Sequence, residues 1–401
     1  MVRESKRWTI LLASTSAFLV GYNITIVAPA LLILTKTFNL TDIEKIMIGS
    51  SALVGNFLGA LLLGHLSDRF GRKYMFIWDI FFFVIISALS AFAGTVLILV
   101  FLRMLLGFGM GGDYPISSTL VAEHSAKNTR GRTVGMLGVA WTFGFFVATI
   151  TGLLMLPLGA NAWRYMFFAP VIPSLIIIVL RGKMLESPIW KQEVAETKNV
   201  GSINEIFSRD VIKFTVYAMS FWFLFDVVQY GISTYAPMVI EQIYNQGNFN
   251  AITGTVILAF VELVGTIVGS LLIDSQGRRT MQILGFAGIT LSMFLAAVIT
   301  TGYSTLLILL LFALSVGIGP GILEFIYPPE LFPSHIRATG SGFSNSMSRL
   351  GAILGVFVLP TIQSSYGILV LFTVYGLFAG LGLIITIILA PETKNKELAS
   401  N

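Results

Sequence analysis

Two short stretches, "GHLSDRFGRKYM" (64–75) and "SLLIDSQGRRTM" (270–281), decide the fold of this chain. Four positions of the first recur in the second at an offset of 206: Asp68, Gly71, Arg72 and Met75 align with Asp274, Gly277, Arg278 and Met281. A second match supports this one, because Glu123 precedes Arg130 by seven residues and Glu330 precedes Arg337 by seven, at an offset of 207. The chain therefore reads as two copies of one structural unit.

The composition places both copies in a membrane. Of the 401 residues, 55% are hydrophobic and only 11% charged, with a mean hydropathy of +0.85. Soluble domains carry about 25% charged residues, so a water-soluble protein is excluded. The continuous apolar runs lack period-two alternation, and backbone groups in lipid need partners within their own segment, so the runs predict helices and not a barrel.

Twelve apolar runs are close to the roughly 20 residues that cross a bilayer, and the first, fourth and seventh are long enough to tilt or break. The predicted spans are 8–36, 46–66, 73–93, 95–122, 133–155, 163–181, 211–240, 249–273, 281–300, 304–328, 339–360 and 366–389. The polar stretch 182–210 divides them, so we expect an N-terminal six-helix bundle (1–181), a cytoplasmic linker with short helices (182–210) and a C-terminal six-helix bundle (211–401).

The basic residues predict the orientation. In this topology 20 of the 25 Lys and Arg residues, Arg181 among them, fall on the same side of the membrane as the two termini, and the positive-inside rule makes that side cytoplasmic. The excess of basic residues thus indicates topology and contact with lipid headgroups, and not a nucleic-acid interface. We expect a multi-pass protein of the cell membrane, most simply a monomer, without cofactor or bound metal. The chain has no cysteine, which excludes thiol chemistry.

The loop motif "GHLSDRFGRK" resembles the signature of the major facilitator superfamily, and the likeness extends over the whole chain. "TRGRTVG", "LESPIW", "PELFPSHIRATGSG" and "APETKNKEL" resemble further signatures of its sugar-porter-like branch. The resemblance implies an all-α fold with a solute site at mid-membrane between the two six-helix repeats. It also implies that charged loop residues latch the halves together on the cytoplasmic side. That gating role is carried to Asp68, Arg72, Glu123, Arg130, Asp274, Arg278, Glu330 and Arg337; static anchoring is the alternative.

Ionisable residues at membrane depth are costly and predict functional sites. Asp79 lies near a helix start, within reach of the interface, and is left out of this set. In "AMSFWFLFDVVQYGIS" (218–233), Trp222, Asp226 and Tyr230 are four residues apart and share one helix face. A lipid-facing stripe would not contain a carboxylate, so this face is expected to line the central cavity. We interpret Asp226 as a proton-coupling group beside the solute; pairing with a buried Arg is the structural alternative.

Span four contains "GGDYPISS", in which Asp113 is predicted to be a second titrating group and Tyr114 a substrate contact. A polar plug at the helix break of Pro115 is the alternative for Asp113. "GGDYPISS" and "WFLFDVVQYG" resemble segments of proton-coupled phosphate symporters, whose Trp, Asp and Tyr line the bound phosphate. The Gln-Gln pair of hexose porters is missing, because Leu224 and Phe225 take its place.

Arg349 is expected either to attract an anion or to pair with a carboxylate. Arg103 is interpreted as structural, and Glu262 receives no role. The chain departs from the phosphate branch at Asn23, where related symporters carry an acid, at "VAWTFGFF" in helix five, and at "GPGILEF" in helix ten. Asn23 is kept as a substrate contact, and Glu324 is a candidate for a relocated proton site.

The sequence predicts secondary active transport by alternating access, most simply proton-coupled symport of a small polar solute. Phosphate or a similar anion is the first choice. A sugar or an organic acid is the alternative, followed by drug-type efflux or a non-transporting membrane sensor. No hydrolase, nucleotide-binding or metal-ligand motif indicates an enzyme.

Overall fold

The protein is described here by a computed structural model, which covers residues 2–181, 186, 190–191, 202–244, 247–299 and 302–398. The described chain is almost entirely helical. Its helices run α1 Val2–Thr25, α2 Val27–Phe38, α3 Asp42–Phe70, α4 Arg72–Ala91, α5 Val96–His124, α6 Arg130–Met155, α7 Ala162–Phe168, α8 Val171–Arg181, α10 Ile212–Tyr244, α11 Gly247–Gln276, α12 Arg278–Val298, α13 Gly302–Ile318, α14 Pro320–Leu331 and α15 Arg337–Leu389, with short 3₁₀ turns η1 Leu156–Asn161, η2 Ile203–Phe207 and η3 Ser334–Ile336.

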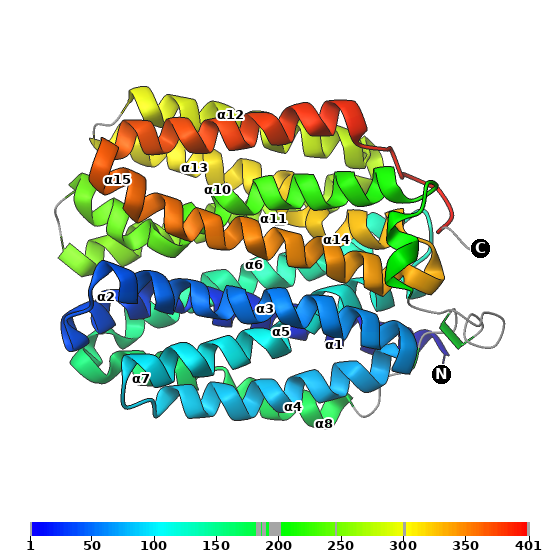
Figure 1. The fold of residues 1–401 in the computed structure, drawn as a ribbon, viewed down its shortest axis with the longest axis horizontal. Helices are drawn as coiled ribbons and strands as arrows, with labels where there is room; N and C mark the ends of the chain where they lie inside the picture. Colours follow the sequence, from blue (N-terminus) through cyan, green and yellow to red (C-terminus); the bar gives the residue numbers. More distant parts are fainter. Residues whose placement is uncertain are drawn as a thin grey trace.

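These helices confirm the predicted all-α membrane architecture. Within the described ranges, nine helical stretches are long and apolar enough to cross a membrane. The predicted spans one, six and ten are each interrupted, between α1 and α2, between α7 and α8, and at Gly319–Pro320 between α13 and α14. The predicted spans eleven and twelve both belong to α15, whose helical geometry breaks at Gly367, with φ 83°. There the chain reverses direction (Figure 1).

Figure 1 shows the helices lying side by side, with those of the first half of the chain mostly below those of the second half and both termini at one end. We call this end the terminal end; it is the end that the sequence predicts to be cytoplasmic. The predicted linker lies largely outside the described residues, apart from Glu186, Trp190, Lys191 and the stretch from Ser202 that contains η2.

Glycines let the helices approach at backbone distance. A Cβ on Gly107 of α5 would lie 1.9 Å from the carbonyl oxygen of Ala52 on α3, and one on Gly55 would lie 1.8 Å from that of Met104. A Cβ on Gly351 of α15 would likewise lie 2.2 Å from the carbonyl oxygen of Phe223 on α10. Small residues at helix contacts drive association in lipid, where the hydrophobic effect contributes little between helices. These contacts set the positions of α5, α10 and α15, which carry residues of the candidate site.

We expect Gly107→Ala to destabilise the protein by about 1–3 kcal/mol, because the added methyl group collides with backbone that cannot move aside. Thermal unfolding of the purified protein measures the loss. Gly94→Ala is the matched control, since a Cβ there meets no atom within 4 Å. Equal melting temperatures for the two variants would contradict the packing described here.

Candidate functional site

A cluster of buried polar and aromatic side chains lies where α10, α5, α14 and α15 meet. The predicted face of α10 contributes Trp222, Asp226 and Tyr230, all of them buried. Trp222 lies against Tyr114 of α5, with ring centroids 5.7 Å apart, and Tyr114 stacks on Phe325 of α14 at 4.4 Å. The structure therefore brings four of the predicted site residues together: Tyr114, Trp222, Asp226 and Tyr230.

Arg349 of α15 is the cation of this cluster and is fully buried. Its Nη2 lies 3.6 Å from Asp226 Oδ2, its Nη1 donates to the Tyr230 hydroxyl, and its Nε donates to Asn345 Oδ1 at 3.1 Å. The guanidinium carbon also lies 5.5 Å from the ring centre of Tyr114. Of the two roles predicted for Arg349, pairing with a carboxylate is the one that this conformation shows.

Glu324 of α14 supplies a second carboxylate. Its Oε1 accepts a hydrogen bond of 2.7 Å from the Tyr114 hydroxyl. Because Tyr114 belongs to the first half of the chain and Glu324 to the second, this bond crosses between the two halves. Two carboxylates thus share the surroundings of one guanidinium. An unbalanced buried charge is strongly unfavourable, so the cluster is electrostatically neutral only when one of the two carboxyl groups is protonated.

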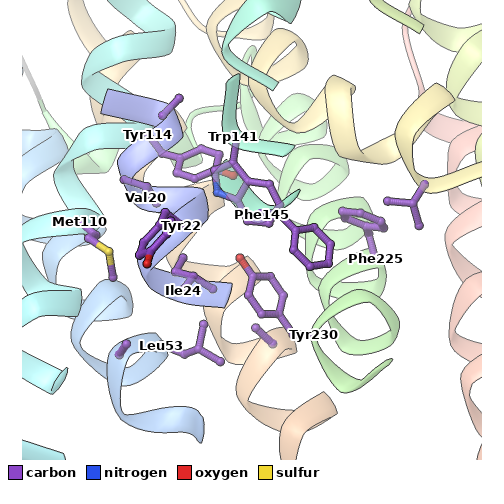
Figure 2. Close-up of a cluster of buried hydrophobic side chains, with 14 of the residues drawn as sticks. Val20, Tyr22, Ile24, Leu53, Met110, Tyr114, Trp141, Phe145, Phe225 and Tyr230 are labelled. Atoms are coloured by element: carbon purple, nitrogen blue, oxygen red, sulfur yellow. The ribbon is translucent and has the colours of Figure 1, made fainter. Parts of the chain in front are cut away.

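The space beside the cluster is small and aromatic. A cavity of about 10 Å³, roughly the room that one water molecule needs, is lined by Ile24, Thr25, Val27, Ala28, Trp141, Phe145, Tyr230, Ser233 and Thr234. Figure 2 shows Tyr114, Trp141, Phe145, Phe225 and Tyr230 gathered around α1. Ligand pockets commonly measure about 300–1,000 Å³. This conformation is therefore closed around the site, and a solute can enter only when the helices separate.

Several polar atoms of the cluster are left without a hydrogen-bond partner within the described residues. They are both carboxylate oxygens of Asp226, Nη2 of Arg349 and Nε1 of Trp222. Buried polar groups are normally satisfied, and exceptions indicate strain, function or a missing partner. Arg349 Nη2 and Asp226 Oδ2 face each other at 3.6 Å, as an ion pair without a hydrogen bond. These atoms and Trp222 Nε1 therefore keep hydrogen-bonding capacity for a polar organic molecule.

Asp113 lies outside this cluster. Its Oδ2 is 3.6 Å from Nη2 of Arg181, and Nη1 of the same arginine lies 3.9 Å from Asp79 Oδ2. All three side chains are buried. The assignment of Arg181 to the basic residues of the cytoplasmic surface is wrong, because its side chain turns inward from the end of α8. The sequence analysis left Asp79 out of the intramembrane charges because it lies near a helix start.

Asn23 does not join the central cluster through any of its described hydrogen bonds. Its side-chain amide donates to Leu19 O in its own helix, and its backbone carbonyl oxygen accepts from Arg103 Nη2 at 3.4 Å. The guanidinium of Arg103 also lies over the Phe167 ring, with 5.0 Å from its central carbon to the ring centre. Glu262 is buried on α11, where its carboxylate accepts from Gln229 Nε2 at 3.2 and 3.3 Å. The sequence offered no signal for this pair.

The eight predicted gating residues lie at the terminal end. Asp68 Oδ2 accepts from the backbone N and the hydroxyl of Thr339, at 2.7 and 2.6 Å, in the first turn of α15. Asp274 does the same for α6, accepting from the backbone N of Gly131 and Arg132 at 3.0 and 2.8 Å. Carboxylates stabilise helix N-termini. Each half of the chain therefore caps a helix of the other half.

Ion pairs complete this terminal network. Glu123 lies 3.1 Å from Arg72 in its own half and 2.8 Å from Arg337 in the other. Arg278 pairs with Asp274 at 2.8 Å and with Glu330 at 2.7 Å. The remaining pairs and bonds are Arg72–Asp68 at 3.1 Å, Arg130 Nη1 to Lys396 O at 3.0 Å and Lys127–Glu397 at 2.7 Å. The hydrogen bond from Lys127 also lowers the pKa of exposed Glu397. The network joins the two halves of the chain at the terminal end.

Two glutamates that the sequence analysis did not single out belong to this network. Glu186 accepts from the backbone N of Arg72 and Lys73 at 3.2 and 3.1 Å, capping α4. Glu392 accepts from the backbone N of Arg278 and Arg279 at 3.0 and 3.1 Å, capping α12. The two glutamates are separated by 206 residues, the offset of the loop motifs. That offset was the signal that could have found them.

We expect Asp274→Asn to loosen the terminal end, because Asn keeps only one acceptor oxygen and the hydrogen bond lost with the other is worth about 1 kcal/mol, or roughly a fivefold change in an equilibrium. The chain has no cysteine, so a single Ser346→Cys reports opening cleanly; Ser346 Oγ donates across the halves to Phe57 O at 3.1 Å. The measurement is the rate of thiol labelling in membranes. Asp210→Asn, at an exposed carboxyl, is the control, and an unchanged rate for Asp274→Asn would argue against a latch.

We expect Arg349→Gln to destabilise the protein by about 3–5 kcal/mol, because it leaves a buried carboxylate without its cation. The double variant Asp226→Asn with Arg349→Gln should recover much of that loss, and Arg349→Lys, which keeps the charge, should lose less. Thermal unfolding in detergent measures all three. The charge pairing described here is refuted if the single and double variants melt together.

Comparison with known proteins identifies the family. The family model of the Major Facilitator Superfamily matches residues 13–356. The chain is 31% identical to the inner membrane metabolite transport protein YgcS of Escherichia coli, over 95% of this chain and 90% of that protein. The chain belongs to the Major Facilitator Superfamily. Its structure superposes on that of the proton:xylose symporter XylE with a TM-score of 0.86 at 21% identity, covering 99% of this chain and 98% of the other, which confirms the fold.

Two further relatives have named solutes. The niacin transporter NiaP of Acinetobacter baylyi is 27% identical, over 94% of this chain and 91% of that protein. The arabinose-proton symporter of Bacillus subtilis is 24% identical, over 96% and 92%. The chain is thus a membrane transporter of this superfamily with metabolite and sugar transporters among its relatives. These relatives give no support to the expected closeness to phosphate symporters.

Proposed function

We propose that this protein carries a small organic metabolite across the membrane together with protons, and that the solute binds in the cluster of Trp222, Asp226, Tyr230, Tyr114 and Arg349. The observation that carries the proposal is the set of unmatched donors and acceptors on Arg349, Trp222 and Asp226, within aromatic walls. Aromatic faces with a few placed polar groups are typical of sites for organic ligands. The relatives that transport niacin and arabinose support the same class.

A carboxylate-bearing solute suits the cluster best. Arg349 is the cation next to both carboxyl groups, and its Nη2 is an unmatched donor. Arg pairs with a carboxylate through two parallel hydrogen bonds. A phosphate dianion, by contrast, would meet one guanidinium, two carboxyl groups and a wall of rings. We therefore replace the first expectation, phosphate, by a small organic acid.

Proton coupling follows from the two carboxyl groups. An organic anion that binds Arg349 competes with Asp226 for the same guanidinium, 3.6 Å from it. Protonation of Asp226 frees Arg349 for the anion and removes the repulsion between them. Glu324, held by Tyr114 across the two halves, is the second group that can take up a proton. Solute and proton thus favour each other's binding.

A neutral sugar is the second candidate, and one observation favours it. Both Asp226 oxygens are acceptors without a donor among the described residues, and sugar hydroxyls donate to such carboxylates. In that case the ionised Asp226 accepts hydrogen bonds from the sugar, and protonation of Asp226 removes these bonds so that the sugar is released.

The test is uptake into proteoliposomes with an imposed pH gradient, acid outside, using radiolabelled niacin, D-xylose and phosphate. We expect accumulation of niacin, and for Asp226→Asn a loss of gradient-driven accumulation of at least about tenfold, since each 1.4 kcal/mol of coupling corresponds to a factor of ten. Asp42→Asn, at an exposed carboxyl paired with Lys45, is the control. Accumulation of phosphate alone, or no accumulation of any organic solute, overturns the proposal.

A further inference from the structure

Three buried charges meet inside the first half of the molecule, away from the solute cluster. Arg181, the last residue of α8, has a fully buried side chain. It lies 3.6 Å from Asp113 on α5 and 3.9 Å from Asp79 on α4, and it also donates to Ser16 Oγ on α1 and to the Phe76 carbonyl on α4. We call Asp79, Asp113 and Arg181 the triad. Four helices converge on it.

The charges of the triad do not balance when all its members are ionised. Two carboxylates and one guanidinium sum to −1. The adjoining cavity, of about 10 Å³, is otherwise lined by Ser16, Leu19, Val20, Ile80, Phe83 and Met110, so among the described residues that line it the triad supplies the charged groups. A net charge buried at membrane depth is costly, and two neighbouring carboxylates do not both ionise readily.

The geometry shows where a balancing proton fits. The carboxyl groups of Asp79 and Asp113 lie against the two terminal nitrogens of one guanidinium, at 3.9 and 3.6 Å, so one cation faces both and a proton on either carboxyl group balances the charge. Asp79 Oδ1 has no hydrogen-bond donor among the described residues.

We propose that the triad is a second proton site of this transporter, separate from the solute cluster, in which Asp79 and Asp113 share one proton beside Arg181. The proton arrives from water and binds to a carboxylate oxygen, which changes the net charge of the triad from −1 to 0. This goes beyond the proposed function, in which the coupling protons bind at Asp226 and Glu324.

The triad is one residue away from the solute cluster along α5. Asp113 belongs to the triad. The hydroxyl of the next residue, Tyr114, donates to Glu324 Oε1 in the other half of the chain at 2.7 Å. Pro115 follows within the helix, and a proline removes a backbone hydrogen bond there. Binding and release of the proton therefore act on the segment that carries Tyr114.

The experiment is infrared difference spectroscopy of the full chain in lipid nanodiscs, recorded over a pH titration without any solute. The C=O band of protonated carboxyl groups is the readout. We expect the wild type to show a titrating component that is missing from both Asp79→Asn and Asp113→Asn, because the carboxylate that remains is then balanced by Arg181 and stays ionised. Asp42→Asn, at an exposed carboxyl, should leave that component unchanged.

Persistence of the whole band in both Asn variants would overturn the proposal and make the triad a static ion cluster. If neither Asn variant stays folded, Arg181→Lys takes their place, because it keeps the charge while altering its distance to both carboxyl groups. The proposal then expects a shifted titration midpoint for the same component, and an unchanged midpoint overturns it. Since no solute is present, failure of the uptake assay has no bearing on this result.

Discussion

The burial of Arg349 between two carboxyl groups and two tyrosines is the constraint on which the centre of this molecule depends. An arginine cannot lose its charge in a protein, so its surroundings must supply the opposite charge. Asp226 and Glu324 supply two, one more than is needed. Because there is one carboxylate more than the guanidinium can balance, binding of a proton or of a charged ligand changes the net charge of the cluster. A well-packed apolar centre would be at least as stable, but it would have no such response.

The same principle operates at the terminal end, where the charges are used to hold helices together. Asp68 and Asp274 each cap a helix of the opposite half, and Glu123 bridges Arg72 and Arg337. The two arrangements repeat because the chain is built from two copies of one unit. The contacts that join the halves at the terminal end are made by charged and polar groups, for which water can supply replacement hydrogen bonds. Close contacts at glycines, such as Gly107 of α5 against Ala52 of α3, hold together the helices within a half.

Much of this could be predicted from the sequence, because apolar runs of membrane length and a repeat at a fixed offset are local signals. The shared face of Trp222, Asp226 and Tyr230 followed from a helical period alone. The residues that contact this face could not be predicted in the same way. The sequence allowed Arg349 either to bind an anion or to pair with a carboxylate, and the packing of α10 on α15 brings Arg349 to Asp226. The close approach of Gly285 to the break at Gly319–Pro320 likewise depends on how α12 packs, which no run of residues reveals.

The triad shows where sequence reasoning failed and why. Arg181 ends a helix beside a polar linker, and basic residues in that position usually mark the cytoplasmic surface. Its side chain is long enough to turn back along α8 and reach two carboxylates. Asp79 was set aside for the matching reason, its nearness to a helix start. In both cases the prediction used the position of the residue along its helix. The burial of the charged group depends instead on the direction in which the side chain points.

Solute-driven proton movement tests the central claim most directly. Proteoliposomes that contain a trapped pH indicator, with equal pH on both sides, receive niacin from outside. The account predicts acidification of the interior in the wild type and none in Asp226→Asn. Entry of niacin without any change of internal pH, or equal acidification by the variant, would contradict it.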